Sequence, residues 1–346
     1  MEKDKKPLFS ILIPTWNNLG FLKLCVESIE KNSAFAHQII VYVNDGSDGT
    51  LDYVKEKGID YVHSPSNVGI CFALNALRPL VKTDYILYMN DDMYVCPQWD
   101  KYLWDEIVKM EGGKMWFLSA TLIQPRPFFS KSVIAPANYG ESVEEFDEER
   151  LLAEYDKLPH HDWLGATWPP NVVHRDTWDL VGGYSVELSP GMYSDPDFSA
   201  KLWLAGVRLF KGVSKSRVYH FEARSTGRIV KNNGSAQFLL KYGITSATFM
   251  KYILHRDEPF PTGGGQISTD KRQGDKGQPY AQQAEETVLS VQRLHAEENL
   301  GGVSLWTKQA KPCGNHTRGN GKGRVGGEKG AHYSFLLPLQ ENKGTH

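Results

Sequence analysis

The sequence predicts an α/β fold in which a mostly parallel β-sheet carries helices on both faces. Residues 8–123 alternate short β-rich runs with segments of helical period, which is the pattern of strands joined by helical crossovers. Polar residues follow one expected strand after another, and in an open parallel sheet ligands bind at the carboxyl ends of the strands. The same segment therefore predicts both the fold class and the place of a site.

The expected strands of this segment are short runs of aliphatic, β-branched and aromatic residues: LFSILIP (8–14), QIIVYVN (38–44), IDYVH (59–63), DYILYM (84–89) and MWFLSATL (115–122). A helix between the first two is predicted by apolar residues at helical spacing, namely Leu19, Leu22, Val26 and Ile29. Pro97 stands where the first position of a helix is expected after the fourth strand.

The second half of the fold is less regular. Residues 124–170 are richer in proline, aromatic and acidic residues, so we expect an insertion that shapes a second binding site. The alternation returns over 171–221 with a strand NVVH, a GGY turn, a helix over about 195–206 and two short strands, VRLFKGV and SRVYHF. A last helical region runs to about residue 254. Its segment 238–254 is interpreted as a helix that packs one face on the core, with an amphipathic helix on a membrane surface as the alternative.

Composition limits the classes of protein to consider. Of the 346 residues, 40% are hydrophobic, which is enough for a real core, and the formal net charge of −2 gives no reason to expect a nucleic-acid partner. The apolar run in MEKDKKPLFSILIP is too short for a signal-peptide core, which favours a cytoplasmic protein. After about residue 260 the chain becomes rich in glycine and poor in apolar clusters, so residues 258–346 are expected to form an unstructured tail.

The four cysteines, Cys25, Cys71, Cys96 and Cys313, are scattered without a C-x-x-C pair, so neither a zinc cluster nor a disulfide framework is expected. Their spacing fits a reducing compartment. Cys25 and Cys71 fall among apolar residues of expected helices, where a thiol behaves as a small core hydrophobe.

The polar residues that follow the first four strands are TWNN (15–18), NDGSDGT (44–50), SNVG (66–69) and NDD (90–92). Each alone is typical of a turn or a helix cap. Together they place two acidic clusters at one sheet edge, as a metal-bound nucleoside diphosphate would require. Asp45 suits a base or ribose, and Asp92 suits a hard divalent cation. No P-loop motif is present, and no G-x-G-x-x-G motif opens the first expected helix, which disfavours other nucleotide-binding folds.

The ordered set PTWNN, VNDGSDGT, NVG…N, YILYMNDDM, GGY, SDPDFSAKLW and YHF resembles the family 2 inverting glycosyltransferases of GT-A fold, of the bacterial surface-glycan type, over about residues 8–254. The resemblance implies transfer of a sugar from a nucleotide-diphosphate donor to an acceptor hydroxyl, with Mg²⁺ or Mn²⁺. It implies a glycan or glycolipid acceptor and a place in polysaccharide synthesis, in the cytoplasm or peripherally at the inner face of the membrane.

The same resemblance divides residues 1–257 into a nucleotide-binding half (8–123) and an acceptor and catalytic half (124–254). It implies that the nucleoside lies among Thr15, Asn17 and Asp45, and that the donor site also contains Asn67, Gly69 and Asn75. The D-x-D place is taken by Asn90, Asp91 and Asp92, and the last of these is the expected metal ligand. Asp91 is expected either to bond the sugar or only to shape the turn.

Two residues of the second half carry the expected chemistry. Residues 192–198 resemble the family's E-D-x-D stretch, with Ser194 where Glu is common, and Asp195 is the candidate base that takes the acceptor proton. The structural alternative makes Asp195 the N-cap of a helix, whose dipole would keep it ionised and weaken it as a base. His220 matches the position of a histidine that completes the metal shell or touches the diphosphate, and a structural histidine is the alternative.

The expected acceptor side contains Trp163, Trp168 and Asp197. Either indole can stack on a sugar face, although core packing is the alternative for both, and Asp197 can hold the acceptor, orient Asp195 or be a solvated carboxylate. Four polar residues, Arg224, Ser225, Thr226 and Arg228, are expected in a loop that closes over the diphosphate or is merely a charged surface loop.

Two other functions stay open at this point. A catalytically degenerate scaffold that binds a donor or a glycan is compatible with Asn90 and Ser194, which depart from the commoner carboxylates. A sugar-phosphate nucleotidyltransferase is disfavoured because no glycine-rich triphosphate loop follows the first strand.

Overall fold

The computed structural model describes residues 6–222 and 230–261. Residues 262–346 of the expected tail and the expected loop with Arg224 to Arg228 lie outside the described residues. The start of that tail was predicted too early, because residues 258–261 still belong to the fold, where the N–H of Phe260 donates to Asp162 O at 2.7 Å. The described residues all belong to one unit, which extends over Met1–Glu297.

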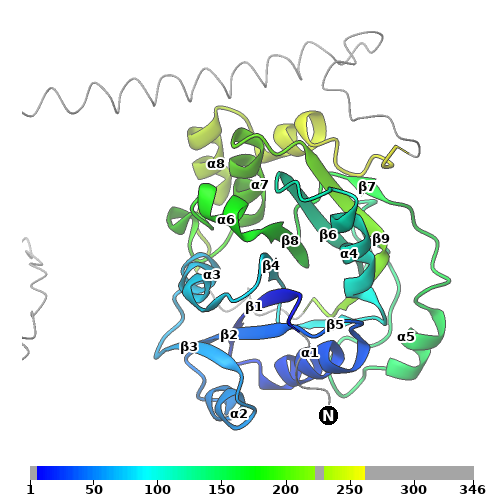
Figure 1. Cartoon of the computed structure of the whole chain (residues 1–346). Helices are drawn as coiled ribbons and strands as arrows, with labels where there is room; N and C mark the ends of the chain where they lie inside the picture. The colour runs from blue at the N-terminus through cyan, green and yellow to red at the C-terminus, as the bar shows by residue number, and fades with distance from the viewer. Residues whose placement is uncertain (1–5, 223–229, 262–346) are drawn as a thin grey trace, which may run out of the picture. The chain divides into compact units, whose positions relative to one another are not determined.

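The described residues form one nine-stranded sheet in the order β3-β2-β1-β4-β8-β6-β9-β5, with β7 paired to β9 (Figure 1). The parallel strands share one direction, while β5, β7 and β8 run against it. The strands are β1 Phe9–Trp16, β2 Gln38–Asn44, β3 Asp60–Ser64, β4 Tyr85–Tyr88, β5 Met93–Val95, β6 Trp116–Ile123, β7 Trp163–Leu164, β8 Asn171–His174 and β9 Leu209–His220. The predicted α/β class with a mostly parallel sheet is confirmed.

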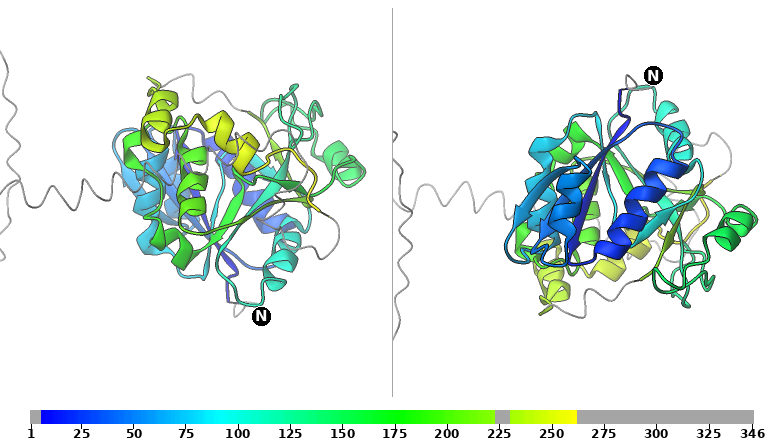
Figure 2. Two further views of the ribbon diagram at one scale, coloured as in Figure 1. Left: turned by 90° about the horizontal axis from the view of Figure 1, so that it is seen from above. Right: turned by 90° about the horizontal axis from the view of Figure 1, so that it is seen from below.

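Helices cover both faces of this sheet (Figure 2). One hydrophobic core forms under α1, α2 and α4, a second under α3, α6, α7 and α8, and a smaller third includes Leu151 of α5. The helices are α1 Leu19–Asn32, α2 Thr50–Glu56, α3 Ile70–Leu77, α4 Trp99–Val108, α5 Glu148–Glu154, α6 Arg175–Leu180, α7 Ser194–Leu204, α8 Gly234–Tyr242 and α9 Ser246–Thr248. Because side chains alternate along a strand, Ile11 and Ile13 enter the first core and Leu12 enters the second.

The local expectations for residues 8–123 mostly hold. All five predicted strands are present within two residues of their expected ends, and Cys25 and Cys71 are fully buried in the cores. The expectation for Pro97 is wrong. The short strand β5 intervenes, and α4 begins only at Trp99, after Gln98 in the left-handed region with φ of 61°.

Two elements of the second half differ from expectation. The two predicted strands over 207–221 are one strand, β9, because the chain does not turn between them but forms a bulge opposite Ala120 and Thr121 of β6. The predicted single helix over 238–254 is broken at Gly243, whose φ of 71° ends α8. The insertion over 124–170 is confirmed as mainly irregular, with α5 and β7 inside it.

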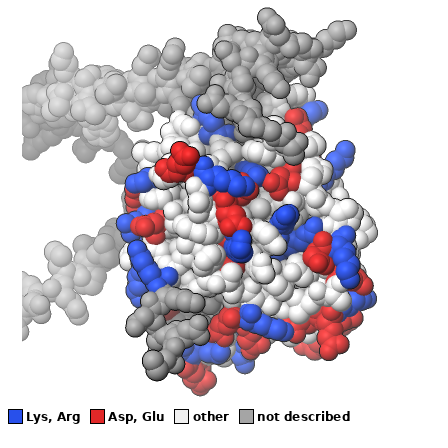
Figure 3. Space-filling model, turned by 45° about the vertical axis from the view of Figure 1, so that its right-hand side comes forward, with Lys and Arg blue, Asp and Glu red and all other residues white. Residues whose placement is uncertain are grey.

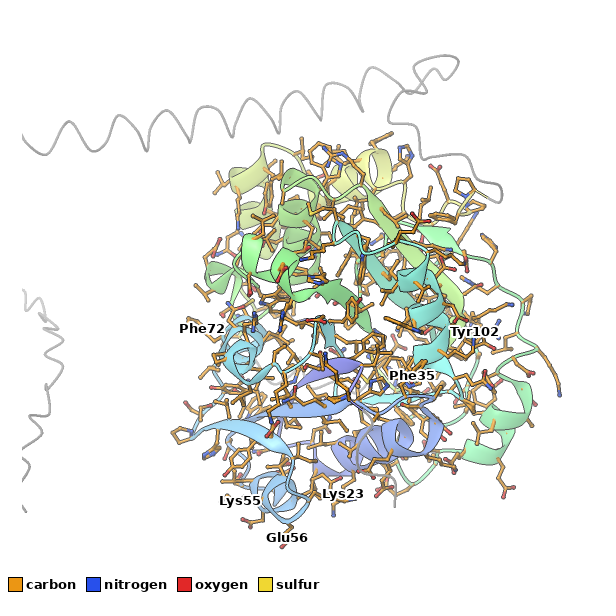
Figure 4. All side chains as sticks on the ribbon, in the orientation of Figure 1. Lys23, Phe35, Lys55, Glu56, Phe72 and Tyr102 are labelled. Atoms are coloured by element: carbon orange, nitrogen blue, oxygen red, sulfur yellow. The ribbon has the colours of Figure 1, made fainter. Side chains whose placement is uncertain are left out.

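The visible surface carries both signs of charge. Lysine and arginine side chains intermingle with acidic ones over the face shown in Figure 3, so no single-sign field dominates it. A few apolar side chains are exposed on the surface of the molecule. Phe72 on α3 projects away from the sheet and is 48% exposed (Figure 4). None of the described helices combines the length and the apolar character needed to cross a bilayer.

A buried carboxylate ties α4 to the end of α1 at the amino edge of the sheet. Asp100 is completely buried and accepts hydrogen bonds from the backbone N–H groups of Ala34 at 2.9 Å and Phe35 at 2.8 Å, and from His37 Nε2 at 3.0 Å. Burial raises the pKa of the carboxyl, but the bonds from His37 and the two N–H groups outweigh it, so the pKa lies below its usual range. This group therefore stabilises the fold above pH 4 or so and loses that effect as the pH falls through its folded pKa.

We expect Asp100→Asn to lower the free energy of unfolding by about 2 kcal/mol, because one or more buried donors lose a charged acceptor. Urea denaturation at pH 7 measures the change. The control is Asp105→Asn on the same helix, whose exposed ion pair with Lys101 should contribute less than about 1 kcal/mol. Equal effects of the two substitutions would contradict the assignment.

Candidate active site

The carboxyl ends of β1 and β2 bring together two of the residues expected at the nucleoside. Asn17 Nδ2 donates to Asp45 Oδ2 at 2.8 Å, and the N–H of Gly46 donates to Asn17 Oδ1 at 2.9 Å. Both Asn17 and Asp45 have positive φ, 46° and 63°, so the two turns are shaped around this contact. The bonds from Asn17 and Ser47 lower the pKa of the Asp45 carboxyl, which keeps it an anion and an acceptor.

The end of β4 carries two adjacent buried carboxylates, Asp91 and Asp92. Burial and the neighbouring Asp92 raise the pKa of Asp91, and a hydrogen bond of 2.6 Å from Thr15 Oγ1 to Asp91 Oδ2 partly offsets this. Thr15 is only 2% exposed. The expectation that Thr15 lies at the nucleoside is therefore not supported, since its hydroxyl is used to hold Asp91.

Asp92 meets His220 across the antiparallel pair of β5 and β9. His220 Nε2 lies 3.4 Å from Asp92 Oδ1, and the ring's Nδ1 lies 2.8 Å from the side-chain nitrogen of Gln124. Burial lowers the pKa of His220, but Asp92 raises it further, so the net shift is upward. Gln124 follows β6 directly, and its Oε1 is buried without a hydrogen-bond partner among the described residues.

A carboxylate and an imidazole within reach of each other fit a divalent cation such as Mg²⁺ or Mn²⁺. Among residues 6–222 and 230–261 no group of three or more His, Cys, Asp or Glu side chains forms a complete metal cage. Asp92 and His220 would therefore hold the ion together with oxygens of a bound ligand or water.

Asp195 lies at the amino end of α7, but it is not the N-cap. The N-cap is Tyr193, with φ of 69°, so Asp195 is the second residue of the helix. Its Oδ1 is buried without a partner among the described atoms, although the residue as a whole keeps part of its surface open. Burial raises the pKa of Asp195 to about 7, against a smaller lowering by the nearby Tyr184 hydroxyl. The expected acidifying effect of the helix dipole is overridden by this desolvation.

Tyr184, from the GGY turn, is the side chain that the sequence analysis passed over at this place. Its ring stacks on Phe198 of α7 with centroids 4.6 Å apart and an interplanar angle of 6°, and its buried hydroxyl lies near the Asp195 carboxyl, whose pKa it lowers. Asn75 on α3 fixes its backbone with two hydrogen bonds: Asn75 Nδ2 donates to Tyr184 O at 2.7 Å, and Tyr184 N donates to Asn75 Oδ1 at 2.8 Å.

The three residues expected in the donor site between β3 and α3 have structural contacts. Both amide atoms of the Asn75 side chain bond the Tyr184 backbone, so Asn75 joins two parts of the site and is not directed at a ligand. Gly69, with φ of 80°, lies against Pro190, which a Cβ would approach to 2.7 Å. The N–H of Ile70 donates to Pro190 O at 2.9 Å. Asn67 Oδ1 accepts from the N–H of Gly69 at 2.9 Å and shapes the turn while its residue remains partly open.

Two residues expected at the acceptor are buried in the protein. Asp197 is completely buried and lies 2.8 Å from Lys241 Nζ and 2.7 Å from the Tyr242 hydroxyl, so neither acceptor contact nor a solvated carboxylate fits it. Trp163 is 3% exposed and donates from its indole N–H to Thr121 Oγ1 at 3.1 Å. Trp163 is therefore a core residue and not a stacking platform, because its ring covers Gly212 of β9, where a Cβ would overlap the ring.

Trp168 differs from Trp163. It is partly exposed, three residues before β8, whose first residue pairs with the carboxyl end of β4. Phe128 lies 5.4 Å from its ring, Phe129 is 76% exposed beside it, and the Arg256 guanidinium lies 4.5 Å above it. These four side chains, called the aromatic ledge below, stand on the same edge of the sheet as the carboxylates.

A mostly parallel sheet with polar turns and carboxylates at its carboxyl edge is typical of α/β proteins that bind their ligands at that edge. Residues 10–112 match the family model described as Glycosyl transferase family 2. Residues 10–112, from β1 to the turn after α4, are therefore identified as a glycosyltransferase family 2 domain. The mostly parallel α/β sheet that was expected from the resemblance to this family is present in the described residues.

Two curated relatives come from Pasteurella multocida. A hyaluronan synthase is 24% identical over 237 residues, which cover 65% of this chain and 22% of the relative. A chondroitin synthase of strain Pm70 is 25% identical over 225 residues, which cover 62% of this chain and 21% of the relative. The chain thus spans about a fifth of the length of these relatives. Among solved structures, Staphylococcus aureus TarS 1–349 in complex with UDP has a TM-score of 0.45 and 15% identity, with coverage of 61% of this chain and 60% of that one.

We expect Asn75→Ala to lower the free energy of unfolding by about 2 kcal/mol or more, because the Tyr184 backbone loses both partners. Asn138→Ala, which removes one exposed turn bond to the N–H of Gly140, is the control and should cost less than about 1 kcal/mol. The affinity of folded Asn75→Ala for the best ligand of a panel of nucleoside diphosphates, measured by calorimetry, should stay close to that of the unsubstituted chain. A selective loss of this affinity at full stability would restore Asn75 to the donor site.

Proposed function

We propose that the chain transfers a sugar from a nucleotide-diphosphate donor to an acceptor hydroxyl with inversion, and that Asp195 is the base. The observation that carries this proposal is the Asp195 carboxyl, which has a pKa of about 7 and a buried oxygen without a partner among the described residues. A general base works best when its pKa lies near the working pH. An inverting displacement needs one such group to take the proton of the attacking hydroxyl.

The donor is proposed to lie along the carboxyl edge from β2 to β5. Asp45, held by Asn17, would accept hydrogen bonds from the nucleoside, and Asp92 with His220 would hold Mg²⁺ or Mn²⁺ beside the diphosphate. The cation would neutralise charge on the leaving diphosphate. Asp91 would make little contact with the donor, because its carboxylate is buried and already accepts a hydrogen bond from Thr15.

The acceptor is proposed to be a glycan or glycolipid that enters over the aromatic ledge. The partly exposed ring of Trp168 and the exposed ring of Phe129 offer flat apolar faces on which a sugar ring can stack, and Arg256 adds a positive charge. The names of the two Pasteurella relatives, hyaluronan synthase and chondroitin synthase, support a polysaccharide-related acceptor. The cytoplasmic location and the peripheral membrane association stay predictions.

For the base, we expect Asp195→Asn to lower kcat by about 10²- to 10⁴-fold while the donor still binds, because the substitution removes proton acceptance but keeps the shape. In the unsubstituted chain, kcat/KM should fall as the pH drops below about 7, since Asp195 must be deprotonated to accept the proton. Release of the nucleoside diphosphate measures turnover.

Asp176→Asn, which removes an exposed carboxylate paired with Lys114, is the control and should leave both kcat and the pH profile unchanged. Full turnover by Asp195→Asn would assign the base to another group. A chain that binds donor and acceptor but never turns over, with or without the substitution, would be the degenerate scaffold.

For the metal, we expect binding of one donor from a panel of UDP-, GDP-, dTDP- and CMP-sugars to depend on Mn²⁺ or Mg²⁺. Asp92→Ala should weaken this binding by about tenfold or more, and a chelator should bring the unsubstituted chain to the same level. Calorimetric titration of each donor with and without the ion measures the effect. Tight binding that ignores both the chelator and Asp92→Ala would exclude the metal role.

A further inference from the structure

Gln124 is a buried polar residue in contact with the proposed metal site. Of its two amide atoms, only the nitrogen has a hydrogen-bond partner among the described residues. The residue is 3% exposed, its side-chain nitrogen lies 2.8 Å from His220 Nδ1, and its Oε1 is buried without a partner in the described part of the chain. Buried amide oxygens are rarely left unpaired in proteins. The orphaned oxygen beside a histidine therefore needs an explanation.

The contact fixes which nitrogen of His220 carries the proton. With the Gln124 amide N–H directed at Nδ1, that nitrogen must accept, so the neutral ring carries its proton on Nε2, facing Asp92 Oδ1 at 3.4 Å. A ring in this tautomer has no lone pair on Nε2 to give to a cation. The opposite tautomer has one, and its Nδ1–H then needs an acceptor at the position of the Gln124 nitrogen.

Gln124 can supply that acceptor without moving its backbone. Its own N–H donates to Ile134 O at 3.0 Å and its carbonyl accepts from Ala137 N at 2.7 Å, so the main chain is fixed at the end of β6. A half-turn of the terminal amide exchanges the nitrogen and Oε1. Since Oε1 has no partner among the described residues before the turn, no hydrogen bond of that oxygen is lost.

We propose that Gln124 is a positioning residue of the metal site, whose turned amide holds His220 with its proton on Nδ1 and leaves Nε2 free for the divalent cation. The ring gives up the Nε2 proton to water and takes one at Nδ1, so its net charge does not change. This inference rests on the proposed metal role of Asp92 and His220. A residue that hydrogen-bonds the outer ring nitrogen of a metal-ligating histidine fixes the tautomer of that histidine in this way.

The test compares two substitutions of Gln124 by Mn²⁺ titration in the presence of UDP, followed by electron paramagnetic resonance of the free ion. Gln124→Met keeps the size but cannot hydrogen-bond, and we expect it to weaken Mn²⁺ binding by about 10- to 100-fold. Gln124→Glu offers a permanent acceptor to Nδ1–H and should bind within about threefold of the unsubstituted chain. Gln38→Met, at a buried glutamine on the opposite edge of the sheet, is the matched control and should also stay within about threefold.

Two-bond ¹H–¹⁵N spectra of the histidine rings show which ring nitrogen carries the proton. A purely structural role of Gln124 would not change that position when metal binds. The His220 proton should be on Nε2 without metal and on Nδ1 with Mg²⁺ and UDP, with His220→Asn used for assignment. In Gln124→Glu it should be on Nδ1 even without metal, which keeps the test available if Gln124→Met does not fold.

Three results would overturn the inference. Gln124→Met that binds Mn²⁺ as tightly as the unsubstituted chain would refute the role of Gln124 alone, and so would a proton that stays on Nε2 in the presence of Mg²⁺. Failure of the unsubstituted chain to bind Mn²⁺ with UDP would instead remove the proposed metal site, and the inference with it.

Discussion

Two hydrogen bonds from the Asn75 side chain to the backbone of Tyr184 join the two halves of this enzyme. Asn75 belongs to α3, at the edge that carries the proposed nucleoside contacts, whereas Tyr184 stacks on α7, the helix that carries Asp195. The bond from Ile70 N to Pro190 O reinforces the same junction. Because this junction holds the segment before the candidate base against α3, the position of that base at the sheet edge depends in part on contacts that touch no substrate.

The carboxylates at this edge differ because their surroundings differ. Asp45 accepts bonds from side-chain donors, and its pKa falls. Asp91 and Asp195 are desolvated, and their pKa values rise. Asp197, equally buried, is paired with Lys241, so its charge is compensated within the protein. Four residues of one chemical type are thereby divided into one carboxyl with strengthened acidity, two with weakened acidity and one in a structural ion pair.

The fold could be predicted from the sequence because its signals are local. Strand periodicity and the polar residues after each strand lie within a few residues of one another, and they located β1 to β4, β6 and the carboxyl edge. Individual roles were harder. Thr15 bonds Asp91 across 76 residues, Asn75 bonds Tyr184 across 109, and Asp197 bonds Tyr242 across 45. A motif that names Thr15, Asn75 or Asp197 does not reveal whether its partner is a ligand or another part of the chain.

Gln124 illustrates the opposite case, because a local rule would have found it. It is a polar residue directly after β6, in the same relation to its strand as the residues singled out after the first four strands. Asp195 shows the limit of such rules. Its place near the start of a helix predicted an acidic carboxyl, and burial, which depends on the folding of distant segments, reversed the direction of the pKa shift.

The order of the strands also bears on how the molecule avoids self-association. The sheet is apolar at its centre, where Ile11, Leu12 and Ile13 are completely buried, but its two outermost strands are short. β5 has three residues and packs beside α1, and β3 has five residues, among them Asp60, which pairs with Lys82. Short, charged or covered edges give another chain little backbone on which to add a strand. The described part of the chain can therefore keep a strongly apolar sheet interior without presenting a long template for aggregation.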